Sequence, residues 1–403
     1  MTNPRNTLAI EGGEPIRTGA WPPEHGIDEA DEEHLLCALR SRIWSAGAMT
    51  TAFESQFAEF CGTRHCLLVE NGTTALKIAL QAVGVEPGHE VIIPGMTWPS
   101  VASAVLECHA APIPVDINLD NFGVSAEAIE SAITPRTKAI VPTHLFSSQA
   151  DLLPIQTVAA RCGVHLIEDC AHVPGARRFG RALGTFGRAG IFSFNQKKLL
   201  SCGEGGCLIT NDSDLFEKAV SLRHFDESPG KLVPGTHRAS EFQAAILASQ
   251  LRKLPARLAL MEERAERLRS LLQQVEGVLP LVRLPGTDRQ TFYNFCFREK
   301  GATEITWFRR ALEAELNLKI SGGYTPLKEV TALKTSSDPR FRVLGQHLDS
   351  HLTNCTVAHY QEAVRFGHYA LMADEKAVDD IARAVEKVQC CQRPGGSAIV
   401  TAT

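Results

Sequence analysis

The clearest sign of the fold is the segment Val164-His165-Leu166-Ile167-Glu168-Asp169, a mostly apolar run that ends on a carboxylate. Other continuous apolar runs, separated by stretches with helical spacing, occupy residues 66–69, 91–94, 113–116, 139–142 and 191–194. Strands that are buried on both faces of a sheet read as continuous apolar runs, whereas half-exposed strands alternate. The pattern therefore predicts an α/β fold with a mostly parallel sheet covered by helices on both faces. In such sheets ligands bind beyond the carboxyl ends of the strands.

The length of the chain predicts more than one core. It has 403 residues, and a single core seldom grows beyond about 250–300 residues. We expect an N-terminal segment at 1–30, a large domain that carries the ligand site at 31–255, and a smaller α+β domain at 256–388. Residues 239–275 have helical spacing, which predicts a long helix leading into the smaller domain. Residues 389–403 lack a burial pattern, and we expect them to form a disordered tail.

The composition excludes several classes of partner. The formal net charge is -5 at pH 7 and no run of Lys and Arg appears, so neither nucleic acid nor an anionic membrane is an expected partner. The N-terminus does not resemble a signal peptide, and no run reaches the roughly 18 apolar residues of a membrane span. The twelve cysteines lack paired CxxC spacing, which predicts reduced thiols and no metal site. We therefore expect a cytoplasmic protein that acts on small molecules.

Two side chains beside apolar runs predict the chemistry. Asp169 ends its run, and Lys198 follows the run at 191–194, shortly before the glycine-rich residues 203–206. Such an acid and amine can hold the two ends of pyridoxal 5'-phosphate (PLP), because its protonated ring nitrogen needs a carboxylate and its aldehyde needs an amine. A helix N-cap is the alternative role for Asp169. Lys197 competes with Lys198, since the residues alone do little to separate two adjacent lysines.

Three further features fit the same ligand. Asn71-Gly72-Thr73-Thr74 stands at a strand-to-helix junction, where unpaired N–H groups and the helix dipole favour a phosphate, although an ordinary N-cap explains the isolated tetrapeptide better. Trp98 could stack on the cofactor ring or lie in the core. His172 would share a face with Asp169 if a helical turn starts there, close to the phenolic oxygen of the ring. No P-loop or dinucleotide motif accompanies them.

The ordered set of motifs resembles the DegT/DnrJ/StrS family of PLP-dependent sugar and aminocyclitol aminotransferases. The motifs lie at 71–76, 88–94, 168–172, 192–199, 203–206 and 240–245, and the similarity spans about residues 10–388. The resemblance implies a type I PLP-dependent aminotransferase fold, with a mostly parallel sheet in the large domain and a smaller C-terminal α+β domain. It also implies a homodimer whose active sites are shared between the subunits.

Carried over by position, the resemblance gives each motif residue a role. Lys198 becomes the Schiff-base lysine, because it stands five residues after Ser193, which matches the family's phosphate-contacting serine. Asp169 matches the acid on the ring nitrogen, and His172 matches the residue beside the phenolic oxygen. The phosphate turn and the stacking aromatic fall on Gly72, Thr73, Thr74 and Trp98.

One departure from the family concerns the dimer. Family members commonly have Asn-Tyr-Arg before the Ser/Thr-Glu-Phe segment, and this asparagine reaches the phosphate bound by the neighbouring subunit. Residues 236–238 here read Thr-His-Arg. Thr236 can still donate a hydroxyl, but it is shorter, so it remains only a candidate for this contact.

The resemblance predicts transfer of an amino group from glutamate or glutamine to a keto-cyclitol or keto-sugar, in antibiotic or other secondary-metabolite biosynthesis. The residues at 170, 195–196 and 201–202 favour the cyclitol and aminohydroxybenzoate branch. A nucleotide diphosphate would need basic residues near the site. Arg177, Arg178 and Arg181 are candidates, although a solvated surface explains them equally well. Tyr324 and His368 could line the acceptor pocket, although core or surface roles explain each of them better.

Two other functions remain open from the sequence. An aminohydroxybenzoate-synthase-type PLP dehydratase/aromatase would keep the lysine, whereas sugar dehydratases of the family typically have histidine in its place. A non-catalytic PLP-binding partner could also have kept the fold, although the intact set at 169, 172, 193 and 198 argues against it.

Overall fold

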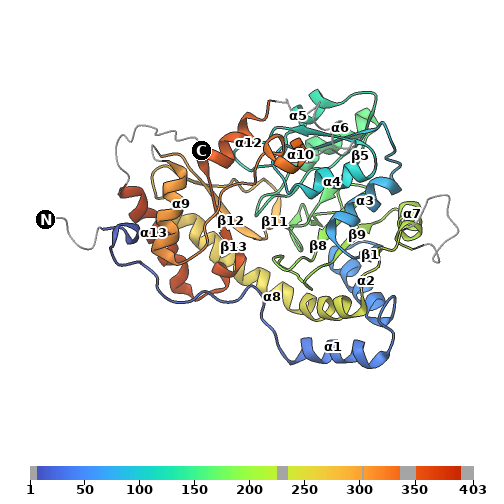
Figure 1. Ribbon diagram of the computed structural model, residues 1–403, viewed down its shortest axis with the longest axis horizontal. Coiled ribbons are helices and arrows are strands. Elements are labelled where there is room, and N and C mark those ends of the chain that lie inside the picture. The colour runs from blue at the N-terminus through green and yellow to red at the C-terminus, as the bar shows by residue number, and fades with distance from the viewer. Residues whose placement is uncertain (1–6, 225–234, 302–303, 336–350, 392–403) are drawn as a thin grey trace.

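The computed structural model describes residues 7–224, 235–301, 304–335 and 351–391, and its largest sheet has seven strands. Helices surround this sheet (Figure 1). β9 is antiparallel to both of its neighbours, and all other adjacent strands pair in parallel. The predicted mostly parallel sheet is therefore confirmed. The strands, in spatial order, are β1 (His65–Val69), β9 (Gly206–Thr210), β8 (Ala189–Ser193), β5 (His165–Asp169), β4 (Thr137–Ile140), β2 (Glu90–Pro94) and β3 (Ala111–Val115).

Both faces of this sheet are buried. In β5, Leu166 belongs to one apolar cluster and Ile167 to another, and Ile92 and Ile93 in β2 divide in the same way. Because successive side chains of a strand point to opposite faces, each face carries its own core. The accompanying helices are α1 (Glu29–Ser41), α2 (Ala48–Cys61), α3 (Gly72–Ala82), α4 (Ser100–Glu107), α5 (Ala126–Ala132), α6 (Leu152–Cys162) and α7 (Ser213–Arg223).

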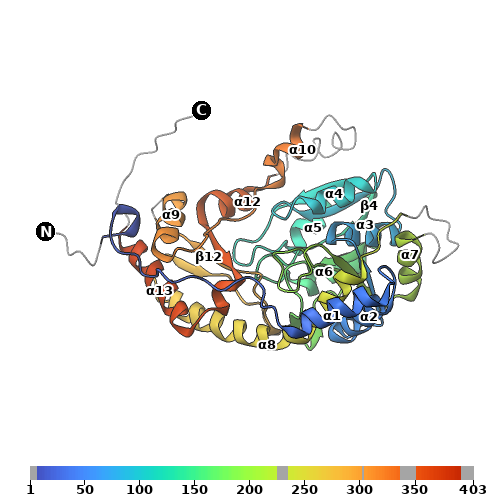
Figure 2. The same cartoon turned by 60° about the horizontal axis from the view of Figure 1, so that its bottom comes forward.

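One long helix, α8 (Glu241–Leu272), leads from this sheet to a second one (Figures 1 and 2). Ser240 begins it with a capping box, in which its hydroxyl accepts the N–H of Gln243 at 3.3 Å and the Gln243 side chain accepts the N–H of Ser240 at 2.7 Å. Pro255 lies inside the helix without ending it. The long helix predicted for 239–275 is thus present, and the domain boundary that we predicted after residue 255 falls within it.

The second sheet is small and antiparallel. It consists of β10 (Val278–Pro280), β12 (Asn294–Glu299) and β13 (Ala363–Gly367), and α13 (Glu375–Cys390) packs against both α8 and α9 (Ile305–Leu316). The remaining elements are short: η2 (Ala9–Glu11), β6 (Arg177–Arg178), β7 (Arg181–Ala182), β11 (Thr287–Arg289), η3 (Leu327–Glu329), α10 (Thr331–Thr335), α12 (Thr353–Val357), η4 (Ala358–Glu362) and η5 (His368–Met372).

The ends of the chain depart from the sequence prediction in one respect. α13 continues to Cys390, two residues into the predicted tail, and residues 392–403 lie outside the described part of the chain. None of the helices described is long and apolar enough to cross a membrane.

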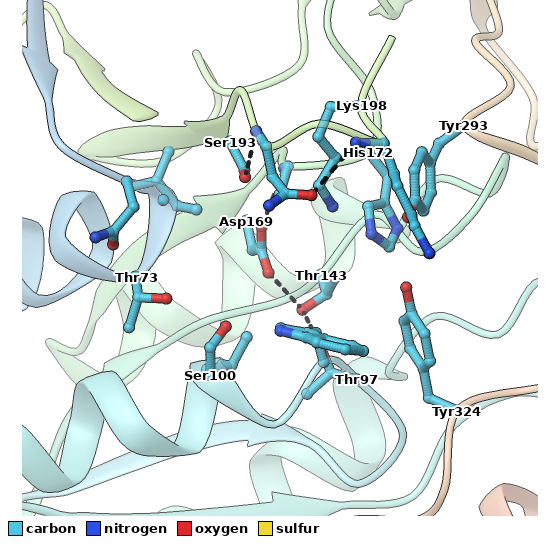
Figure 3. A pocket seen from close by; sticks show the side chains of 18 of the residues that line it. Thr73, Thr97, Ser100, Thr143, Asp169, His172, Ser193, Lys198, Tyr293 and Tyr324 are labelled. Carbon is cyan, nitrogen blue, oxygen red and sulfur yellow. Dashed lines mark hydrogen bonds between the residues drawn. The ribbon is translucent and has the colours of Figure 1, made fainter. Parts of the chain in front are cut away.

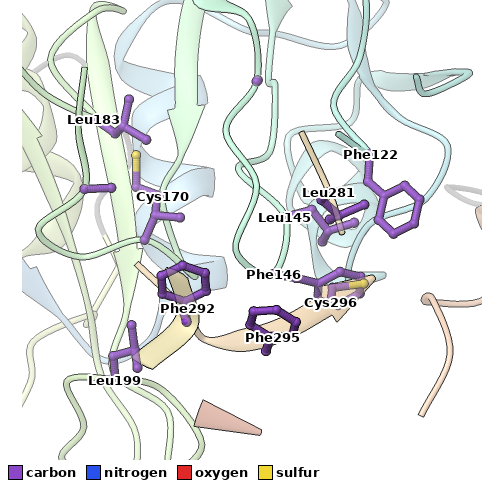
Figure 4. Close-up of a cluster of buried hydrophobic side chains, with 14 of the residues drawn as sticks. Phe122, Leu145, Phe146, Cys170, Leu183, Leu199, Leu281, Phe292, Phe295 and Cys296 are labelled. Atoms are coloured by element: carbon purple, nitrogen blue, oxygen red, sulfur yellow. The ribbon is translucent and has the colours of Figure 1, made fainter. Parts of the chain in front are cut away.

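The two sheets share one apolar core. Figure 4 shows Phe295 of β12 and the preceding Phe292 among buried side chains that include Phe146, which follows β4. Cys170 and Leu199, which directly follow Asp169 and Lys198 in sequence, belong to the same cluster. The small sheet is therefore packed against the segments that carry the predicted site.

Candidate active site

A cavity of about 900 Å³ opens at the carboxyl edge of the large sheet. Five strands each contribute a residue to its wall from the point where the strand ends, as expected for ligand sites in parallel sheets. These residues are Gly72 after β1, Thr97 after β2, Thr143 after β4, Asp169 of β5 and Ser193 of β8. The cavity thus brings together segments that are far apart in the sequence.

Asp169 is buried at the end of β5 (Figure 3). One carboxylate oxygen accepts the N–H of Ala171 at 3.0 Å and the other accepts the hydroxyl of Thr143 at 3.3 Å, while Thr143 in turn contacts the Thr97 hydroxyl at 3.1 Å. Burial raises the pKa of Asp169, and nearby Lys198 only partly opposes this effect. The carboxylate forms no ion pair with any residue of the described part, so it can still accept a cationic partner from a ligand.

The two adjacent lysines differ in surroundings. Both line the cavity, but Lys197 is exposed, whereas burial lowers the pKa of Lys198 to about 8 against the opposing effect of Asp169. The Lys198 ammonium group lies 4.4 Å from the centre of the Tyr293 ring. An amine with a pKa near 8 is partly neutral at physiological pH and can act as a nucleophile or a base.

His172 is buried beside the same ring. Its Nδ1 accepts the N–H of Phe146 at 3.0 Å, and burial lowers the pKa of the imidazole well below its usual range. His172 is therefore neutral with its proton on Nε2, which is free to donate. Its ring stacks on Tyr293 at 4.2 Å between centres.

The start of α3 forms a tight cradle. Asn71 caps the helix by accepting the N–H of Thr74 at 2.8 Å, which leaves the N–H groups of Gly72 and Thr73 without intrahelical acceptors. A Cβ atom at Gly72 would lie 2.8 Å from the Cβ of Ser193. Only glycine therefore lets the helix start approach the end of β8 this closely, and the cradle has the features of an anion site.

The two remaining predicted residues, Trp98 and Thr236, differ in their position relative to the cavity. Trp98 lines the cavity and meets Tyr324 edge-on, with 5.4 Å between the ring centres. Thr236 is exposed, pairs with His224 and does not line the cavity of its own chain, so its contact with a partner's cofactor stays a prediction.

The substrate candidates also divide. Tyr324 and His368 both line the cavity, whereas the three arginines proposed for a nucleotide diphosphate do not. Arg178 is buried and pairs with Asp151 at 2.9 Å, Arg177 donates to the carbonyl of Gly180, and Arg181 lies over the ring of Phe186. The described part of the chain therefore gives no support to these three candidates as phosphate ligands of its own cavity.

Sequence reasoning missed several residues that line the cavity. Tyr293, Arg365 and Glu24 all belong to its wall but lie outside the motifs, in segments that the large sheet does not contain. His237 also lines the cavity, and its Nδ1 lies 2.9 Å from a carboxylate oxygen of Glu70. Among these, only the position of His237 next to Thr236 could have indicated the site.

The architecture defines a class of enzyme. A lysine follows one strand of a mostly parallel sheet, and a buried acid ends the adjacent strand. A helix N-terminus that can hold a phosphate lies beside them. This is the arrangement of the type I fold of PLP-dependent aminotransferases. The model of the DegT/DnrJ/EryC1/StrS aminotransferase family matches residues 25–386. The chain belongs to this family and is an aminotransferase.

Relatives of known function cover nearly the whole chain. The L-glutamine:2-deoxy-scyllo-inosose aminotransferase of Streptoalloteichus tenebrarius is 37% identical over 94% of this chain and 97% of its own length. The L-glutamine:scyllo-inosose aminotransferase of Streptomyces griseus is 36% identical over 95% and 97%. Among solved structures, 3-amino-5-hydroxybenzoic acid (AHBA) synthase superposes with a TM-score of 0.82 at 31% identity, covering 93% of this chain and 99% of its own.

The first prediction concerns Lys198. Because burial lowers its pKa to about 8, labelling of its amine by an amine-selective reagent should rise with a midpoint near pH 8. Brief labelling of the ligand-free protein over a pH series, read by peptide mass spectrometry, measures this midpoint. A midpoint in the usual range of a lysine amine would contradict the effect of burial on Lys198.

The second prediction concerns the cradle. Gly72→Ala forces α3 away from the end of β8 and should lower the free energy of unfolding by roughly 1–3 kcal/mol, the usual cost of overpacking. Denaturant titration measures the change, and Gly26→Ala is the matched control, since a Cβ there would meet nothing within 4 Å. An unfolding free energy for Gly72→Ala equal to that of the control would show that the helix start is not tightly held.

Proposed function

We propose that the chain uses PLP to transfer the amino group of L-glutamine to a keto-cyclitol. The proposal rests on one observation: Asp169, Lys198 and the start of α3 all line the same cavity. Relatives that are 36–37% identical along nearly the whole chain, and whose names specify glutamine and inososes, support the choice of donor and acceptor.

The residues fit PLP at each of its polar groups. Asp169 forms no ion pair within the described residues, and the protonated ring nitrogen would supply one. The Nε2 proton of His172 suits the phenolic oxygen, and the free N–H groups of Gly72 and Thr73, together with the Ser193 hydroxyl, suit the phosphate. Trp98 could cover one face of the ring, as in the sequence prediction.

The chemistry then follows from the chain's own groups. Bound PLP supplies the aldehyde that carries the amino group and the ring that accepts an electron pair. The Lys198 amine would hold this aldehyde, and as a free amine it would act as the base that moves a proton between the donor's α carbon and the cofactor. Asp169 would keep the proton on the ring nitrogen. The same residues act in the reverse order on the ketone, which predicts ping-pong kinetics.

Arg365 is the proposed partner of the donor's α-carboxylate. Its Nε donates to the carbonyl of Gly322 at 2.6 Å and its Nη1 to Asn294 at 3.3 Å, and its guanidinium lies over the rings of Phe146 and Tyr324 at 4.8 and 5.1 Å. Arg365 lines the cavity and forms no ion pair with a described residue. A half-buried guanidinium without a carboxylate favours an anionic ligand.

A homodimer is part of the proposal. α1 exposes Leu35, Leu36 and Leu39, and Ile43 and Trp44 follow it with more than half of each residue exposed. An apolar surface of this kind is typical of protein interfaces. The carbonyl at 44 also accepts the N–H at 241, so the exposed side chains lie beside the segment at 236–242 that the family places across the dimer.

A second candidate function is the formation of an aminohydroxybenzoate. The 31% identity and TM-score of 0.82 with AHBA synthase favour it. Its product is aromatic, so it requires loss of water from the substrate in addition to amino-group chemistry.

The third prediction tests the function directly. The protein, loaded with PLP and converted to the amino form with L-glutamine, is offered scyllo-inosose, 2-deoxy-scyllo-inosose, a nucleotide-linked keto-sugar and a keto-cyclohexene carboxylic acid that would become aromatic by losing water. We expect amination of an inosose, seen by mass spectrometry of the product. Lys198→Ala should lower this rate by roughly 10²–10⁴-fold or more, the usual contribution of a general base, while Lys197→Ala keeps most of it. Reaction with only the nucleotide-linked sugar or only the carboxylic acid would overturn the proposed acceptor.

The fourth prediction concerns the donor. Arg365→Met removes the guanidinium but keeps an unbranched side chain of similar length. The KM for L-glutamine should rise about ten- to a hundredfold, since a hydrogen bond to a charged group contributes roughly 1.5–3 kcal/mol. The KM for the ketone should change much less. A larger effect on the ketone than on glutamine would place the donor's carboxylate elsewhere.

A further inference from the structure

Residues 21–28 form a segment, here named the crossing segment, that precedes α1. It is fixed to α8 and to two segments that line the cavity, η5 and the loop that carries the two lysines. The carbonyl of Glu24 accepts Nε2 of His368 at 3.2 Å and Nη2 of Arg257 at 3.4 Å. His25 Nε2 lies 2.5 Å from the carbonyl of Gln196, two residues before Lys198. The backbone at Glu24 is therefore held between α8, η5 and the loop that carries the two lysines.

The Glu24 side chain lines the cavity. It is half-buried, and its carboxylate has no hydrogen bond or ion pair with any residue that the structure describes. Lys319 lines the same cavity without pairing with it. A partly desolvated carboxylate with open acceptor positions favours a ligand that brings hydrogen-bond donors.

Glu24, Arg365 and Tyr293 all line the cavity. Burial raises the pKa of the Tyr293 hydroxyl, Arg365 opposes this effect, and Glu24 adds to it. Burial also raises the pKa of Tyr369, with Glu24 as the next cause. A cation and an anion therefore face the same part of the cavity, yet they form no ion pair with each other, which leaves both available to one ligand.

We propose that Glu24 selects substrates that present neutral hydrogen-bond donors at this wall: the side-chain amide of L-glutamine in the first half-reaction and adjacent hydroxyls of the keto-cyclitol in the second. The inference rests on the proposed function and names the residue that sets its substrate class. With the donor's α-carboxylate on Arg365, the far end of the amino acid is directed toward Glu24.

The negative charge of Glu24 explains why anionic substrates are disfavoured. An amide NH₂ or a pair of vicinal hydroxyls can donate to a carboxylate, and such charge-assisted hydrogen bonds are about twice as strong as neutral ones. The side-chain carboxylate of glutamate, or a nucleotide diphosphate, would place a like charge beside Glu24 with no donor between them. One side chain thus disfavours anionic alternatives to both substrates.

The test compares Glu24→Gln with Glu263→Gln, an exposed α8 residue outside the cavity wall that serves as a control for loss of charge. Steady-state assays give kcat/KM for L-glutamine and for L-glutamate. We expect Glu24→Gln to lower the glutamine-to-glutamate ratio by about ten- to a hundredfold, the size of one charge-assisted hydrogen bond, and the control to leave it unchanged. A purely structural role would lower both values together and leave the ratio as it was.

A binding measurement gives a second readout that needs no turnover. Calorimetry with scyllo-inositol, which cannot react, and with 2-oxoglutarate should show weaker inositol binding and tighter 2-oxoglutarate binding in Glu24→Gln than in the unmodified enzyme. An unchanged donor ratio and unchanged affinities in an active enzyme would overturn the role of Glu24 alone. Absence of transamination with any donor and any ketone in the unmodified enzyme would instead overturn the proposed function.

Discussion

Burial of the Asp169 carboxylate is the constraint on which the site depends. β5 carries it to the carboxyl edge of the sheet, where it accepts one backbone N–H and one hydroxyl. Burial raises its pKa, because two neutral donors do not replace the hydration that a carboxylate loses. A cation would therefore stabilise the carboxylate at the end of β5, and the protonated ring nitrogen of the proposed cofactor would be that cation.

The neighbouring carboxylate shows the opposite solution. Glu168 is also buried, but it accepts three backbone N–H groups from residues 184–187 at 2.6–2.8 Å, and His144 Nε2 lies 3.3 Å away. Since Nδ1 of His144 accepts the N–H of Ala150, Nε2 carries the proton toward Glu168. This carboxylate is satisfied by the protein and holds a turn in place, although His144, Glu168 and Cys170 lie close enough together to suggest metal ligands. Successive residues of one strand thus serve the fold on one face and the ligand on the other.

Many of the residues proposed to bind the cofactor could be predicted from the sequence, because their signals are local. Continuous apolar runs indicated the strands, and Asp169, Ser193 and the turn at 71–74 each follow from the end of one run. Local signals in the residues do not separate the two adjacent lysines. The difference between them depends on the loop after β8, which places the amine of Lys198 over the ring of Tyr293, a residue far away in the sequence. Glu24 and Arg365 carried no motif at all, since tertiary packing alone brings the crossing segment and β13 to the cavity.

The two kinds of residue also come from separate parts of the architecture. The groups proposed to bind the cofactor lie at strand ends of the large sheet, whereas the proposed substrate groups lie on the crossing segment and the small sheet. The shared apolar core fixes these parts against each other, so the distance from the amine to the substrate wall is set by packing. In the proposed arrangement, replacement of one residue on that wall would change the substrate without disturbing the strand ends, in keeping with the different functions that a single fold can host.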